Sequence, residues 1–88
     1  MQLKNDLGSV IRFRNELTVI SADLEDNRRS VESNVEELNE TWNDSKFQEF
    51  NARFEEENEF VKRLIENIND FNDSYLYNTQ RALEGYLY

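Results

Sequence analysis

Carboxylates are the side chains of this sequence whose types and spacing could do chemistry. Glu36 and Glu37 are adjacent, and residues 55–57 form a run of three glutamates. Paired carboxylates can act as a general acid and base, or they can bind a hard cation through oxygen. Both groups lie on long polar flanks without a predicted pocket, which is typical of solvated helix faces.

Other signals for catalysis are weak. The sequence contains no His and no Cys, which excludes histidine-based triads, zinc-protease sites and thiolate metal sites. Residues 70–74 are similar to the start of a calcium loop, but Tyr75 and Arg81 stand where such a loop has its Gly and its final Glu. We therefore expect no enzyme, no metal and no cofactor. A carboxylate-based metal enzyme or hydrolase is the least favoured of the hypotheses for the function of this chain.

The elements that position these residues follow from two heptad patterns of almost equal length. In the first pattern an apolar row has a mixed companion row: Leu3, Val10, Leu17, Leu24, Val31 and Leu38, beside Leu7, Arg14, Ser21, Arg28, Val35 and Trp42. In the second pattern the two rows are Phe47, Phe54, Val61, Ile68, Tyr75 and Ala82, and Phe50, Glu57, Leu64, Phe71, Asn78 and Gly85. Such spacing indicates helices packed along a narrow seam. The sequence predicts one all-α domain over residues 1–88, a hairpin with a helix over about 3–41, a turn at 42–45 and an antiparallel helix over about 46–84.

The residues of the turn have distinct expected roles. Trp42 is expected to plug the end of the hairpin against Leu38 and Phe47. Asn43 is expected to close the first helix in a left-handed conformation. Ser45, with Gln48 three residues later, predicts a capping box that starts the second helix, and Asp44 adds negative charge there.

The helical pattern weakens near the end of the chain. Residues 67–74 are rich in Asn, Asp and Ser, which are poor helix formers. Beyond them Leu76, Leu83 and Leu87 sit one position away from the earlier apolar row. We expect the last two turns to fray or rotate.

Two charged residues fall on the predicted seam. Antiparallel pairing around residue 44 brings Arg28 close to Glu57. The sequence predicts an ion pair there that fixes the register of the helices. The alternative is that both side chains extend outward to solvent.

Several apolar residues cannot face a single partner helix. They are Ile11, Phe13, Val19 and Ile20 in the first helix, and Phe60, Ile65, Leu76, Leu83, Tyr86 and Leu87 in the second. Exposed apolar area of this kind usually marks an interface. We expect two hairpins to dimerise into a four-helix bundle, with this chain itself or a related hairpin as the partner.

Charge and hydropathy limit the other partners. The formal net charge of −9 predicts repulsion from nucleic acid and from anionic membranes. No stretch approaches the roughly 20 apolar residues that span a bilayer, and no apolar segment follows Met1. We expect a cytoplasmic protein, or one secreted without a cleaved signal peptide.

Trp42 between two helices of equal length, with Phe50 eight positions later, resembles the WXG family of small secreted helical hairpins, the early-secreted-antigen-like substrates of type VII secretion. Asp44 stands where the family has Gly, and Lys46 where a small residue is common. The family's export signal, Tyr followed four residues later by an acidic residue, is not matched by Tyr75 or Tyr77.

This resemblance implies a non-enzymatic interaction protein that acts as a substrate, co-substrate or adaptor of a type VII-like secretion system. It also implies a larger secreted effector or a secretion ATPase as a further partner. The alternative is a cytoplasmic structural or adaptor coiled coil unrelated to secretion.

Overall fold

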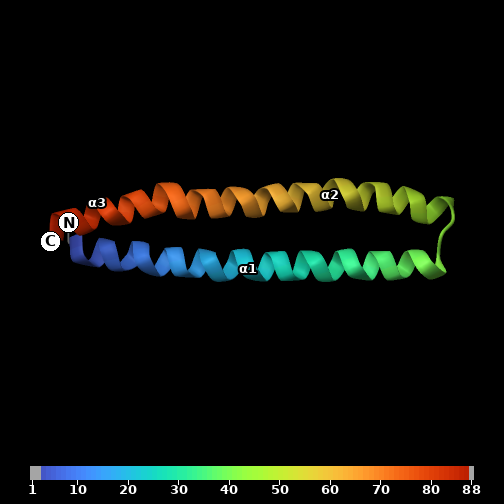
Figure 1. Ribbon diagram of the computed structural model, residues 1–88, viewed down its shortest axis with the longest axis horizontal. Coiled ribbons are helices and arrows are strands. Elements are labelled where there is room, and N and C mark those ends of the chain that lie inside the picture. Colours follow the sequence, from blue (N-terminus) through green and yellow to red (C-terminus); the bar gives the residue numbers. More distant parts are fainter. Residues whose placement is uncertain (1–2, 88) are drawn as a thin grey trace.

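The chain folds into a helical hairpin (Figure 1). A computed structural model describes residues 3–87, with side chains from residue 6 onward, so the side chain of Leu3 lies outside the described part. Helix α1 spans Leu3–Thr41, α2 spans Ser45–Asp70, the π-helix η1 spans Phe71–Leu76 and α3 spans Tyr77–Leu87. The predicted all-α hairpin is confirmed, and its second arm continues to Leu87.

The hairpin is a rod. It measures 63 × 16 × 16 Å, and its radius of gyration is 19.4 Å, against about 12 Å for a compact domain of this length. Helix α1 runs along the whole of the other arm, so that the start of α1 and the end of α3 lie at the same end (Figure 1). A fold with two helices side by side can bury only one narrow strip of each helix.

The strip that faces the other helix is partly polar in both arms. We call these strips the contact rows: Leu7, Arg14, Ser21, Arg28 and Val35 in α1, and Asn51, Asn58, Ile65 and Asn72 in the second arm. Ser21, Asn58 and Asn72 are 5%, 8% and 4% exposed. The sequence-based seam had Phe50, Leu64 and Phe71 in place of the second row, and these three are exposed.

The π-helix explains why the apolar row shifts near the end of the chain. A π-turn inserts one extra residue, which rotates the following helix by about 100°. Leu76 is therefore buried and Leu83 and Leu87 are half-buried, whereas Tyr75 is 63% exposed. The expectation for the last turns was that they fray or rotate. They rotate, and they stay helical.

Few apolar side chains are buried in the described part of the hairpin: Leu7, Val35, Phe47, Ile65 and Leu76. The same part contains no helix that is both long and apolar enough to cross a membrane.

Candidate functional site

The turn between α1 and α2 is closed by Asp44. This residue is extended (φ −116°, ψ −173°), and its Oδ1 accepts the backbone N–H of Phe47 at 3.0 Å, which makes it the N-cap of α2. The capping box at Ser45 was therefore wrong by one residue, because Ser45 is already the first residue of α2. The left-handed Asn43 was also wrong, since no described residue other than glycine has a positive φ.

Aromatic side chains cover the turn end of the hairpin. Phe47 is only 2% exposed, and the ring of Trp42 packs edge-on against it at 5.5 Å between centroids. Phe50 follows at 6.2 Å from Phe47. The expected contact of Trp42 with Phe47 is present, but Trp42 keeps 38% of its surface exposed and Phe50 keeps 44%. Phe47 is thus the plug of the hairpin end, and Trp42 covers it.

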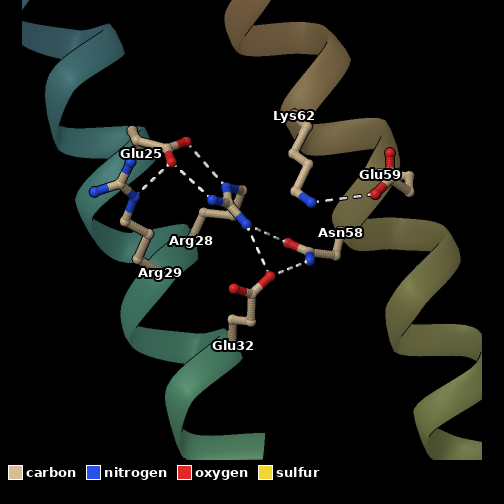
Figure 2. Close-up of polar contacts among 7 residues, drawn as sticks. All are labelled: Glu25, Arg28, Arg29, Glu32, Asn58, Glu59 and Lys62. Atoms are coloured by element: carbon tan, nitrogen blue, oxygen red, sulfur yellow. Dashed lines mark hydrogen bonds and ion pairs between the residues drawn. The ribbon is translucent and has the colours of Figure 1, made fainter.

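A polar layer crosses the middle of the hairpin at Arg28 (Figure 2). The Nε and one Nη of Arg28 donate to the two oxygens of Glu25 at 2.9 and 2.7 Å, and the other Nη donates to Glu32 at 3.0 Å. Asn58 joins the layer from α2, because its Oδ1 accepts from Arg28 at 3.2 Å and its Nδ2 donates to Glu32 at 2.7 Å. The layer connects both helices through a closed ring of hydrogen bonds.

The charges of this layer perturb one another. The hydrogen bonds from Arg28 and, to a smaller extent, from Arg29 lower the pKa of Glu25 to about 2. The pKa of Glu32 is lowered by the amide of Asn58 and then by Arg28. In the turn, the backbone N–H of Phe47 lowers the pKa of Asp44. All three carboxylates are therefore held in their ionised form.

A second polar layer of the same type lies toward the open end. The Nε of Arg14 donates to Oδ1 of Asn72 at 2.9 Å, and the Nδ2 of Asn72 donates to the backbone oxygen of Arg14 at 3.2 Å and to Thr18 at 3.1 Å. Arg14 also donates to Gln80 at 2.8 Å and lies over the ring of Tyr77, 5.2 Å from its centroid.

The two layers fix one register for the hairpin. Arg14 and Arg28 are two heptads apart in α1, and so are Asn72 and Asn58 in the other arm. Both Arg–Asn pairs therefore form together at one and the same alignment of the two helices along the rod. Sequence reasoning missed the two asparagines, although this matched spacing of Arg and Asn was the signal that could have found them.

Arg28 and Glu57 are not joined as the sequence predicted. Glu57 is exposed, and no ion pair links it to Arg28 among the described residues. The register-fixing role falls instead to Asn58, one residue further along α2, because that residue lies in the contact row.

One face of the hairpin is apolar. The wholly apolar heptad rows lie on this face beside the contact rows, and we call them the lateral rows: Val10, Leu17, Leu24, Val31 and Leu38 in α1, and Phe47, Phe54, Val61 and Ile68 in α2. Between them runs a groove of about 230 Å³, whose apolar lining includes Leu24, Val31, Phe54 and Val61. Except for Phe47, no residue of these two rows is buried. Val31 and Leu38 are 48% and 40% exposed.

The apolar face is widened by residues further from the partner helix. We call these the outer rows: Phe13, Ile20, Asn27 and Asn34 in α1, and Phe50, Glu57, Leu64 and Phe71 in the second arm. Their five apolar members are exposed. The lateral rows and these five residues together form what we call the apolar face.

The opposite face of the hairpin is polar. Its groove near the turn is lined by Val35, Phe47 and Phe54 and by six polar residues: Glu32, Glu36, Asn39, Asn51, Glu55 and Asn58. Glu32 and Asn58 also belong to the Arg28 layer. The two faces of the hairpin therefore differ in chemistry.

The residues that the sequence proposed for a dimer interface divide into three groups. Phe13 and Ile20 belong to the apolar face, and Phe60 lies at its edge, 57% exposed. Ile65, Leu76 and Leu83 pack inside the hairpin, because the contact row and the π-turn direct them toward α1. The remaining two lie on neither surface. Counted from the contact row at about 100° per residue, Val19 points away from α2, and Ile11 lies on the same side of α1 as Glu25.

Comparison of the chain with protein families, with curated proteins and with solved structures finds no match.

Proposed function

We propose that this chain is a non-enzymatic interaction module, whose apolar face packs against a second helical hairpin to give a four-helix bundle. The observation that carries the proposal is the position of the two wholly apolar rows. Each helix turns a partly polar contact row toward its neighbour and leaves its best apolar row on the open face. In a four-helix bundle the lateral rows would meet in the centre.

The exposed surface supports the same proposal. The chain exposes 6851 Å², whereas a typical monomer of 10.6 kDa exposes about 5,500 Å². The excess of roughly 1,400 Å² exceeds the about 800 Å² that each partner contributes to a standard interface. A second hairpin on the apolar face would remove this excess.

A matched pair of variants tests the interface. Val31 lies on the apolar face and Val19 points away from α2, and both are half-exposed valines in α1. Val31→Asp should weaken association at least about tenfold, because burying a valine side chain contributes about 1.5 kcal/mol or more. Val19→Asp should leave association unchanged. Sedimentation velocity measures both, and equal effects of the two substitutions would contradict the proposal.

We also propose a link to type VII-like secretion, as substrate, co-substrate or adaptor. The support is the WXG-like turn between two helices of nearly equal length, together with Asp44. Its extended backbone and capped helix start close the turn without the family's glycine. Affinity capture of the tagged chain from native cells, with assay of the culture medium, tests this. Recovery of a secretion ATPase or effector, or of the chain in the medium, is expected.

The alternative, a structural or adaptor coiled coil, is favoured by one contact. The ring of Tyr77, one of the tyrosines at which an export signal would begin, lies under the guanidinium of Arg14, so Tyr77 takes part in the hairpin itself. Capture of assembly proteins alone, with no chain in the medium, would support this function.

A further inference from the structure

We propose that the second hairpin is a second copy of this chain, related by a two-fold axis along the rod, so that both turns lie at the same end. This inference rests on the proposed four-helix bundle and adds its partner and orientation. The observation behind it is the order of apolar and polar residues in the outer rows, which are the rows that would meet a neighbouring hairpin.

A two-fold axis along the rod leaves every residue at its own height. It places α1 of one copy beside the second arm of the other, antiparallel and in the register that already operates within one chain. That register is known from the Arg14–Asn72 and Arg28–Asn58 hydrogen bonds. The two copies cannot shift along the rod relative to each other in this symmetry, so the pairing of the outer rows follows from the sequence.

In this arrangement three of the four pairs in the outer rows match in polarity, and the fourth places Asn34 beside Phe50 of the second copy. Within the outer rows, Phe13 comes closest in height to Phe71 of the second copy, and Ile20 to Leu64 of the second copy. Asn27 comes closest in height to Glu57 of the second copy, which gives the one exposed acid of the outer rows an amide donor. In the first two pairs apolar side chains would meet apolar ones, and the Asn27–Glu57 contact would occur twice by symmetry.

The opposite orientation, with the turns at opposite ends and the rods fully overlapped, pairs the same rows poorly. It places Glu57 beside Phe71 of the second copy, which would bury a carboxylate without a partner. It also places Phe13 between Asn27 and Asn34 of the second copy. Polarity therefore selects the same-end orientation.

The charged edge of the apolar face agrees with this choice. Beyond the outer row, α1 has Glu16, Asp23 and Glu37, whereas α2 has Lys46 and Arg53, and all five are exposed. The same-end orientation places Glu37 between the two basic residues of the second copy. The opposite orientation would place the acidic edge of α1 against itself, which is unfavourable.

Distance measurement distinguishes the two orientations. The chain has no Cys, so Asn43→Cys in the turn and Gly85→Cys at the open end each provide one labelling site, and a Cβ at Gly85 meets nothing within 4 Å. With both turns at one end, spin labels on Asn43→Cys should lie roughly 20–35 Å apart, the width of a bundle with helices about 10 Å apart plus the label arms. Labels on Gly85→Cys should be similarly close. A mixture of the two variants should give distances near the 63 Å length of the rod.

The possible results separate this inference from the proposed function. Short same-site and long mixed distances support the same-end dimer. Long same-site and short mixed distances in a dimer would overturn the orientation and leave the four-helix bundle intact. A monomer in sedimentation equilibrium at 100 μM, the concentration chosen for the labelling experiment, would overturn the second copy as the partner and would leave a related hairpin as the partner in the four-helix bundle.

A charge-reversal experiment tests the proposed contact between Asn27 and Glu57 of the second copy. Asn27→Glu places two carboxylates together at each Asn27–Glu57 contact and should weaken the dimer at least tenfold. The control is Asn15→Glu, an exposed asparagine of α1 that lies one residue after Arg14 and therefore on the polar side of the hairpin. An equimolar mixture of Asn27→Glu and Glu57→Lys should form mixed dimers in preference to Asn27→Glu dimers. Unchanged dimerisation of Asn27→Glu, or no preference in the mixture, would overturn the pairing.

Discussion

Replacing Phe47 by alanine should remove a large part of the stability of the hairpin. Phe47 is 2% exposed, and it is the largest fully buried side chain among the described residues. Truncating a buried phenylalanine to alanine costs about 3–5 kcal/mol. At about 0.05–0.15 kcal/mol per residue, a chain of 88 residues has a total stability of about 4–13 kcal/mol. One substitution at the turn end should therefore remove between a quarter and all of it.

The assay is thermal unfolding followed by circular dichroism at 222 nm. With an unfolding entropy of about 2.1 cal/mol/K per residue, a loss of 3–5 kcal/mol corresponds to a fall in Tm of roughly 16–27 °C. All variants are compared at one protein concentration, because association adds concentration-dependent stability.

Phe50→Ala is the matched control, since Phe50 packs at a tilt against Phe47 in the same aromatic cluster but is 44% exposed. About half of a phenylalanine's burial corresponds to a loss of about 1–2 kcal/mol. Trp42→Ala, at 38% exposed, should also cost less than Phe47→Ala. If Phe47→Ala and Phe50→Ala lower the Tm equally, the assignment of Phe47 as the plug is refuted.

Four further outcomes are expected. Asp44→Ala should lower the Tm by roughly 4–8 °C in circular dichroism because α2 loses its N-cap, whereas Ser45→Ala should change it little. Since the folded-state pKa of Glu25 is about 2 and its ordinary value 4.5, the stability that its ion pair with Arg28 adds is complete above pH 4.5 and is lost as the pH falls toward 2; urea midpoints of Glu25→Gln and the native chain should differ at pH 7 and converge at pH 2. Asn58→Leu with Asn72→Leu should keep or raise the Tm but give more than one set of amide signals in NMR, because nothing polar then selects the register. Deleting exposed Asp73 from η1 should convert it to an α-turn and leave the Tm within a few degrees of the native value, whereas deleting Ala52 should unfold the hairpin; a large loss for the first deletion would contradict the role of the π-turn.

The hairpin itself could be predicted because its signals are redundant. Both heptad patterns run for about forty residues and stop at the same four residues, and α1 ends at Thr41 as the spacing predicts. A shift of one or two residues in either pattern would not change that conclusion. The start of α2 was less certain, because Asp44 and Ser45 are both good N-cap residues and only the backbone decides between them.

The direction in which each helix faces could not be predicted in the same way. Each apolar heptad row has two neighbouring rows, one three residues later and one four residues later, and either can complete the seam. For the second arm, the sequence-based seam took the more apolar neighbour, with Phe50 and Leu64. The structure uses the other neighbour, with Asn58 and Asn72, because their amides complete hydrogen bonds to Arg28 and Arg14. A rule that places the most apolar residues inside a single hairpin fails here, because directional hydrogen bonds turn the two asparagines toward α1.

The polar contact rows and the apolar lateral rows contribute in different ways. Hydrogen bonds between Arg and Asn depend on direction, so they select one register, although each adds little net stability. Apolar burial depends on area and not on direction, so it favours association without choosing a register. A chain that had placed its lateral rows between its own helices would have a better core and no reason to associate. By keeping the directional contacts inside the hairpin, this chain presents its apolar face in one defined geometry, which is what an interface with one specific partner requires.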